Sequence, residues 1–143
     1  MQTTHIRIVI LDRDLSDAFS MRQWLEGSGH RVIGIASSLA QARRIVSHEH
    51  ADLALVETEL EDGTDGAEAA RILKQRHGLK ILFVTAAPEA ARQGADAAAG
   101  CVLKPIRPLA LLAAIQCAVA QGASDQPGDR HVPVEQSRAF EMY

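Results

Sequence analysis

Aromatic residues are scarce in this chain: Phe, Tyr and Trp together make up 3% of its 143 residues. Because 47% of the residues are nevertheless hydrophobic, the core must be built from aliphatic side chains and alanine. A chain of this length is sufficient for one domain with one core. We therefore expect a single domain with an aliphatic core.

The chain also lacks a basic surplus, a cysteine motif and a long apolar run. Its net charge of −3 provides no footprint for nucleic acid. Cys101 and Cys117 have neither CxxC nor Cys/His metal spacing, which is typical of reduced thiols in a cytosolic protein. The first apolar run, residues 6–11, is too short for a signal core or a membrane span. We expect a cytoplasmic protein without nucleic-acid or membrane partners.

Short apolar runs alternate with helical patterns along the chain. Runs rich in β-branched residues predict strands at 6–11, 31–35, 53–56, 80–84 and 100–103. Helical periodicity predicts helices at 16–28, 39–50, 65–77 and 108–120. Only 86–99 remains for a fourth helix, which must be short. The alternation predicts a doubly wound parallel α/β sheet.

The chain loses its periodicity near residue 123. The stretch 123–143 is polar at first and regains apolar residues at its end. We expect a domain at 1–122 followed by a disordered tail at 123–143, with a docking peptide at the end as the alternative.

Polar residues follow four of the predicted strands. Asp12 and Asp14 follow the first, Glu57 the third, Thr85 the fourth and Lys104 the fifth. In an open parallel sheet the carboxyl ends of the strands share one edge, where ligands bind. Capping of the next helix would explain one such residue, but residues on four strand ends indicate a functional site.

Taken together, these pieces resemble the receiver domain of two-component response regulators over residues 6 to about 121. The resemblance rests on Asp12-Arg13-Asp14, Glu57, Asp65-Gly66, Thr85 and Lys104-Pro105. It implies the flavodoxin-like (βα)5 fold, for which we predict the strand order 2-1-3-4-5. In that family an acidic pair and an acceptor aspartate bind Mg2+, and a histidine kinase supplies the phosphoryl group. The family also has a Thr or Ser and a Lys that hold the phosphoryl oxygens, and a cis peptide bond before the residue that corresponds to Pro105.

Three positions depart from the family pattern. Glu57 stands at the acceptor position, Arg13 replaces the second acid of the pair, and Cys101 replaces the usual aromatic switch residue. Mg2+ prefers hard oxygen ligands, whereas an arginine offers no lone pair and adds a positive charge. We expect no cofactor and an impaired Mg2+ site, with Arg13 paired to Glu57 or Asp12.

The departures indicate a stand-alone pseudo-receiver that signals by protein contacts and is not an enzyme. The added methylene of Glu57 carries its carboxylate toward Lys104 or Thr85, so this side chain can imitate part of the phosphorylated state. The alternative is a site that has lost its function. A phosphoreceiver that uses Asp14 and Glu57 remains open. So does a haloacid-dehalogenase-like phosphatase, because Asp12-Arg13-Asp14 also resembles the Asp-x-Asp of that family.

The expected partners are proteins. A histidine kinase or another signalling protein is implied by the resemblance. The last helix has a broad apolar face, formed by Leu109, Leu111, Leu112, Ile115 and Val119. This face is compatible with a homodimer through the fourth helix, fifth strand and fifth helix, and deep packing of the helix within the domain is the alternative.

Overall fold

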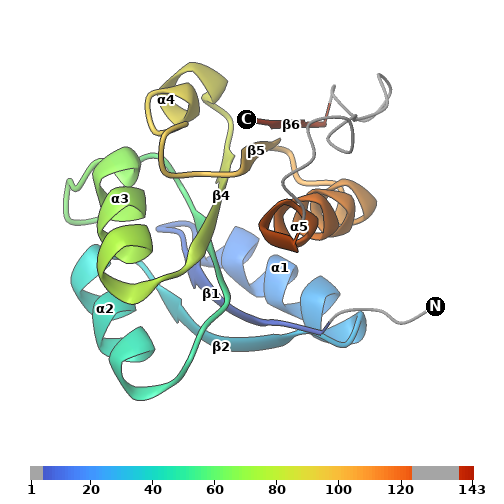
Figure 1. Ribbon diagram of the computed structural model, residues 1–143, viewed down its shortest axis with the longest axis horizontal. Helices are drawn as coiled ribbons and strands as arrows, with labels where there is room; N and C mark the ends of the chain where they lie inside the picture. Colours follow the sequence, from blue (N-terminus) through green and yellow to red (C-terminus); the bar gives the residue numbers. More distant parts are fainter. Residues whose placement is uncertain (1–4, 124–138) are drawn as a thin grey trace.

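The computed structural model describes residues 5–123 and 139–143. Its strands are β1 (Arg7–Leu11), β2 (Arg31–Ala36), β3 (Leu53–Val56), β4 (Lys80–Thr85), β5 (Gly100–Leu103) and β6 (Phe140–Met142). Its helices are α1 (Leu15–Gly27), α2 (Leu39–His48), α3 (Gly66–His77), α4 (Pro88–Arg92) and α5 (Pro108–Ala123). The strands form one sheet in the order β2-β1-β3-β4-β5-β6 (Figure 1). Strands β1 to β5 are parallel, which confirms the predicted order 2-1-3-4-5, and β6 is antiparallel to β5.

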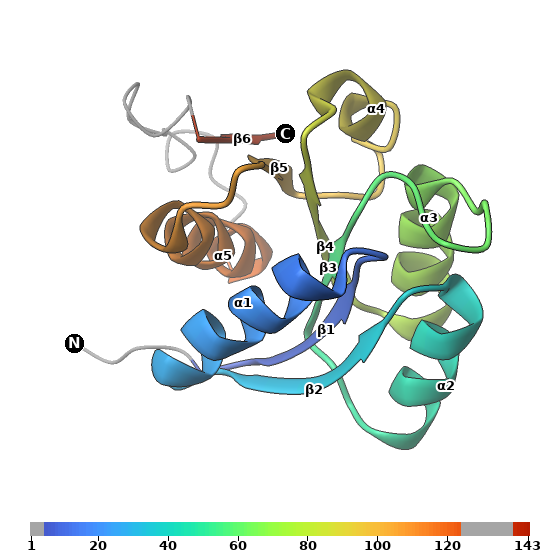
Figure 2. The ribbon, with the colours of Figure 1, turned by 180° about the vertical axis from the view of Figure 1, so that it is seen from behind.

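Helices cover both faces of the sheet. Helices α1 and α5 lie on one face and α2 and α3 on the other, with α4 above β4 and β5 (Figures 1 and 2). Strand β1 shows how the sequence serves both layers: Ile8 and Ile10 belong to the core beneath α1 and α5, whereas Val9 and Leu11 belong to the opposite core. A strand buried on both faces requires the nearly continuous apolar run that predicted it.

Local signals fix where the helices begin and end. The side chains of Asp14, Ser38 and Asp65 cap the amino ends of α1, α2 and α3. Gly78 ends α3 in the left-handed conformation, with a φ of 72°. Helix α4 has only five residues, as the short fourth segment predicts. Within the described residues, no helix is both long and apolar enough to cross a membrane.

The end of the chain differs from the sequence-based expectation. The disordered tail predicted at 123–143 is wrong for its last residues, because Phe140–Met142 form β6 against β5. Ala123 is the last residue of α5, and residues 124–138 lie outside the described part of the chain. Phe140 is fully buried against α5 and β5, which gives this short strand an anchor in the core.

Candidate functional site

The loops that follow β1, β3, β4 and β5 surround a hollow of about 350 Å³ at the carboxyl edge of the sheet. Its lining brings together most of the residues singled out from the sequence: Asp12, Arg13, Asp14, Glu57, Thr85 and Lys104, with Thr58, Glu59, Ala86 and Ala87. Gly66 makes this arrangement possible, because any Cβ there would collide with the carbonyl oxygen of Glu57. The Lys104-Pro105 bond is cis, as the resemblance implies.

Lys104 forms the centre of the hollow and contacts three carboxylates. Its Nζ lies 2.9 Å from Asp12 Oδ2, 2.8 Å from Asp17 Oδ2 and 3.0 Å from Glu57 Oε2. Burial lowers the pKa of the Lys104 ammonium, but the hydrogen bonds to these acids outweigh that effect, so its pKa lies above the ordinary value. Lys104 therefore stays charged, and one cation faces three acids.

Asp12 is the most buried member of the cluster, with 1% of its surface exposed. Burial raises the pKa of its carboxyl group, while hydrogen bonds from the Asp14 amide and from Lys104 act in the opposite direction. The Asp14 amide donates to Asp12 Oδ1 at 2.9 Å, and Lys104 donates to Asp12 Oδ2. Both carboxylate oxygens thus have partners from the protein.

A chain of hydroxyl groups connects Glu57 to the loop after β4. Thr58 Oγ1 donates to Glu57 Oε1 at 3.1 Å and lies 2.9 Å from Thr85 Oγ1. Thr85 Oγ1 accepts from the Ala87 amide at 3.1 Å. Because the Thr58 proton points to Glu57, the Thr85 hydroxyl donates to Thr58. The carboxylate therefore reaches the backbone of Ala87 through two threonines rather than by a direct bond to Thr85.

Arg13 and Asp14 take other roles than those expected of an acidic pair. The predicted pairing of Arg13 with Glu57 or Asp12 is wrong: its guanidinium contacts Glu59 at 2.6 Å, and 54% of its side chain is exposed. Lys104 already neutralises the buried acids, and an exposed guanidinium keeps its hydration. Asp14 caps α1 by accepting from the Asp17 amide at 3.1 Å.

Cys101 lies in the core and does not line the hollow. It is fully buried on β5, and burial raises the pKa of its thiol to about 12. The aromatic position of the family pattern is thus filled by an inert thiol that packs beside Phe83.

The donor set does not fit the Mg2+ site that the family implies. Arg13 occupies the position of one acid, and the Lys104 ammonium contacts the carboxylate oxygens of Asp12 and Glu57 that an ion would need. Across residues 5–123 and 139–143, no group of three or more His, Cys, Asp or Glu side chains has an arrangement able to hold a metal.

Comparison with known proteins identifies the family. The model of the response regulator receiver domain matches residues 8–116. The chain belongs to the response regulator receiver family. It is 31% identical to the phyllosphere-induced regulator PhyR of Methylorubrum extorquens over 114 residues, which covers 78% of this chain but only 43% of that protein.

Two solved structures show the same receiver fold. The receiver domain of a modulated diguanylate cyclase from Desulfovibrio desulfuricans G20 has a TM-score of 0.78 at 25% identity and covers 86% of this chain and 100% of that one. The response regulator PhyR from Brucella abortus has a TM-score of 0.76 at 26% identity, covering 92% of this chain and 55% of that one. This chain therefore contains a receiver of the two-component signalling type.

Two residues of the site were not predicted from the sequence: Asp17, which contacts Lys104, and Thr58, which lines the hollow. Asp17 lies in the first turn of α1, where an acid normally signals only favourable interaction with the helix dipole. Thr58 directly follows Glu57, and a threonine in a loop carries no distinctive signal. Once the fold is known both can be found, because Thr58 lies two residues beyond the end of β3 and Asp17 lies in the first turn of the helix that follows β1.

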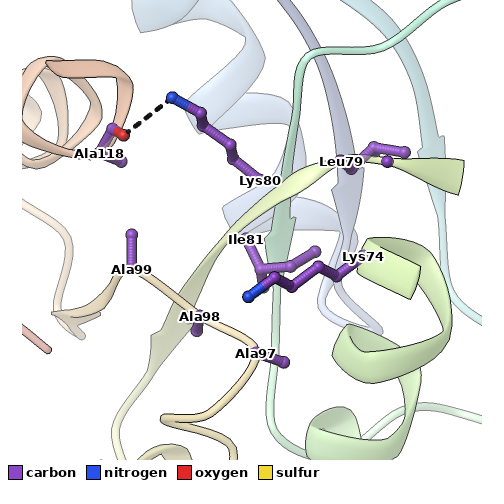
Figure 3. Close-up of a pocket in the computed structure, with 9 residues that line it drawn as sticks. Lys74, Leu79, Lys80, Ile81, Ala97, Ala98, Ala99 and Ala118 are labelled. Carbon is purple, nitrogen blue, oxygen red and sulfur yellow. Dashed lines mark hydrogen bonds between the residues drawn. The ribbon is translucent and has the colours of Figure 1, made fainter. Parts of the chain in front are cut away.

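A second hollow of about 420 Å³ lies at the opposite, amino edge of β4 and β5 (Figure 3). Alanines line much of it, and the ammonium of Lys80 donates to the carbonyl oxygen of Val119 at 2.9 Å. Lys74, from α3, completes the lining (Figure 3). Both lysines donate to backbone carbonyls, so this hollow offers no set of acids comparable to the first.

Proposed function

We propose that this receiver signals through protein contacts without the phosphoryl transfer that is usual in its family. The observation that carries the proposal is the contact between Lys104 Nζ and Glu57 Oε2 at 3.0 Å. In a phosphorylated receiver the corresponding lysine holds a phosphoryl oxygen. Here the longer side chain of Glu57 supplies a permanent oxygen to that lysine.

The charges support partial mimicry. A carboxylate brings one negative charge, whereas a phosphoryl group brings about 1.5 to 2. Asp17 adds another carboxylate to Lys104 at 2.8 Å, so the total negative charge around the ammonium exceeds that of Glu57 alone. The mimic is then shared between Glu57 and Asp17.

The chain of threonine hydroxyl groups can transmit the effect of the Glu57 carboxylate to the start of α4. Thr58 and Thr85 connect the Glu57 carboxylate to the amide of Ala87, which immediately precedes α4. Removing the negative charge of Glu57 would weaken the first bond of this chain and loosen the start of α4. We propose that the loop is held permanently in the conformation that a phosphorylated receiver reaches only transiently.

The partner is proposed to be a histidine kinase or another signalling protein. One solved relative carries the description of an anti-anti-sigma factor, PhyR of Bartonella quintana, at 26% identity. That description applies to a longer protein, because the present chain covers only 52% of the Bartonella quintana PhyR chain. We propose a protein ligand for the present chain on the same grounds, together with its lack of basic charge.

The test is covalent labelling with acetyl phosphate in the presence of Mg2+, read by intact-protein mass spectrometry. We expect no stable phosphoryl adduct on the unaltered protein. The double variant Glu57→Asp/Arg13→Asp restores the family's acids and should bind Mg2+ and accept phosphate.

The single variant Glu57→Asp is the matched control, and it should remain unlabelled because Arg13 still replaces the metal ligand. Labelling of the unaltered chain would refute the proposal and favour the alternative in which Asp14 and Glu57 serve a working phosphoreceiver.

A further inference from the structure

The β5 edge of the sheet is occupied by the end of the chain itself. Strand β6 lies along the outer edge of β5, between α4 and α5 (Figures 1 and 2). The Leu103 amide donates to the carbonyl of Ala139 at 2.8 Å, and the Tyr143 amide donates to that of Ala99 at 2.8 Å. These bonds bracket β5. While β6 remains in place, β5 is not available as an edge strand for the homodimer expected through the fourth helix, fifth strand and fifth helix.

On the face of the sheet that α1 and α5 cover, the β5 edge accommodates an apolar side chain of β6. Phe140 of β6 pairs with Val102 and is fully buried in the core beneath α1 and α5. Leu111 and Ile115 of α5, both fully buried, belong to the same core. Leu111 and Ile115, two of the residues expected to face a dimer partner, are therefore buried in the same core as Phe140, whereas Leu109 is 81% exposed.

The opposite face recognises an acid. Arg92, the last residue of α4, donates to Glu141 through Nε at 2.9 Å and through Nη2 at 3.1 Å. Glu141 pairs with Cys101, whose buried side chain offers no competing charge. This two-pronged geometry selects a carboxylate at the strand position next to the apolar anchor.

The backbone of β5 is shaped for close approach. Gly100 has no side chain, and a Cβ there would collide with the carbonyl oxygen of Glu141. Beside it, the Tyr143 hydroxyl is buried without a hydrogen-bond partner among the described residues. The first feature lets a strand backbone approach β5 closely, and the second places a polar group of the last residue against the buried thiol of Cys101.

We propose that the β5 edge is a strand-addition site for a partner protein. In the unbound protein β6 covers this edge, and a strand of the partner can displace it. The partner would present an extended segment with an aromatic residue followed directly by an acid, as in Phe140-Glu141. The inference rests on the proposed function, in which the chain acts by protein contacts, and it assigns the surface. It does not depend on the state of Glu57.

The test uses full-length charge variants at the clamp. Arg92→Glu and Glu141→Arg each place like charges together, whereas the double variant restores an opposite pair. Hydrogen exchange of the Leu103 amide should quicken roughly tenfold in each single variant and return toward normal in the double variant. The matched control is Arg31→Glu on β2, which breaks an exposed ion pair with Glu49 at the end of α2 and should leave the exchange of the Leu103 amide unchanged.

A labelled peptide with the sequence of residues 139–143 then probes the opened edge. It should bind Glu141→Arg, in which Arg92 is intact, at least about tenfold more tightly than it binds the unaltered protein. A peptide with Phe and Glu interchanged should bind weakly, since each side chain would face the wrong layer. Unchanged Leu103 exchange, failure of the double variant to restore it, or equal binding of both peptides would overturn the proposal. Phosphoryl labelling bears only on the proposed function, so the two can fail separately.

Discussion

The two hollows at opposite ends of the strands are similar in volume and differ in chemistry. At the carboxyl edge one lysine holds three carboxylates that come from three segments of the chain. At the amino edge Lys80 donates to backbone carbonyls of α5, and four of the nine lining residues are alanines. Size therefore does not distinguish a functional site from a packing gap.

What distinguishes them is the consequence of removing the central cation. Without Lys104, the buried carboxylate of Asp12 and the partly buried carboxylate of Glu57 would lose their counter-charge and repel each other. Without Lys80, the carbonyls of Ala118 and Val119 would lose an additional donor, but no charge would be left unpaired.

The largest effect is expected for Lys104→Met. This variant leaves an uncompensated cluster of acids and should lower the free energy of unfolding by roughly 3 kcal/mol. Urea denaturation at neutral pH is the measurement. Lys104→Arg keeps the charge and should lose much less; equal losses in the two variants would mean that packing, rather than charge, holds this edge together.

The next effect is a dependence on alkaline pH. The pKa of Lys104 is higher in the folded protein than its ordinary value of 10.5. Its contribution is therefore fully present below pH 10.5 and is lost as the pH rises through the folded pKa. The stability difference between the unaltered protein and Lys104→Met should narrow above that pH.

The comparison with Lys104→Met isolates this effect from other groups. The pKa values of Cys101 and Tyr143 are also raised by burial, so both groups lower stability in alkali in either protein. Urea unfolding from pH 9 to pH 11.5 supplies the measurement, about one pH unit on either side of the ordinary lysine pKa. A constant difference across this range would contradict the assignment.

The sequence predicted most of the fold because strand runs buried on both faces and capped helices are local signals. The five parallel strands, the short α4 and the convergence of Asp12, Glu57, Thr85 and Lys104 all follow from residues near strand ends. Strand β6 could not be predicted in the same way. Three residues are too few to show a period, and Phe140 gains its burial only from α5 and β5, which lie far away in sequence.

The site was predicted in position but not in connectivity. Which acid Lys104 contacts depends on the orientation of α1, and this orientation brings Asp17 to the ammonium. Likewise, Arg13 turned outward to Glu59 because its long side chain reaches solvent once Lys104 occupies the centre. Such choices are made by competition among side chains in three dimensions, which strand-end patterns do not record.

A smaller effect is expected for Thr58→Val, which keeps the shape of the side chain and removes the hydroxyl. Glu57 loses one hydrogen bond, and the buried Thr85 hydroxyl loses its acceptor. The free energy of unfolding should fall by about 1–2 kcal/mol, and amide exchange at Ala87 should quicken. Normal exchange at Ala87 would show that the hydroxyl chain does not couple Glu57 to α4.

The smallest effect is expected at the amino edge, for Lys80→Met. The methionine keeps much of the length of the side chain and removes the ammonium that contacts the carbonyls of Ala118 and Val119 near the end of α5. A cation at a helix carboxyl end contributes about 0.3–1 kcal/mol, and its loss leaves no buried charge. Urea denaturation should therefore show a loss within that range, with the same slope against denaturant as the unaltered protein. A loss as large as that of Lys104→Met would mean that the two ends of the sheet are equally dependent on their lysines. The chemical contrast between the hollows would then have no energetic counterpart.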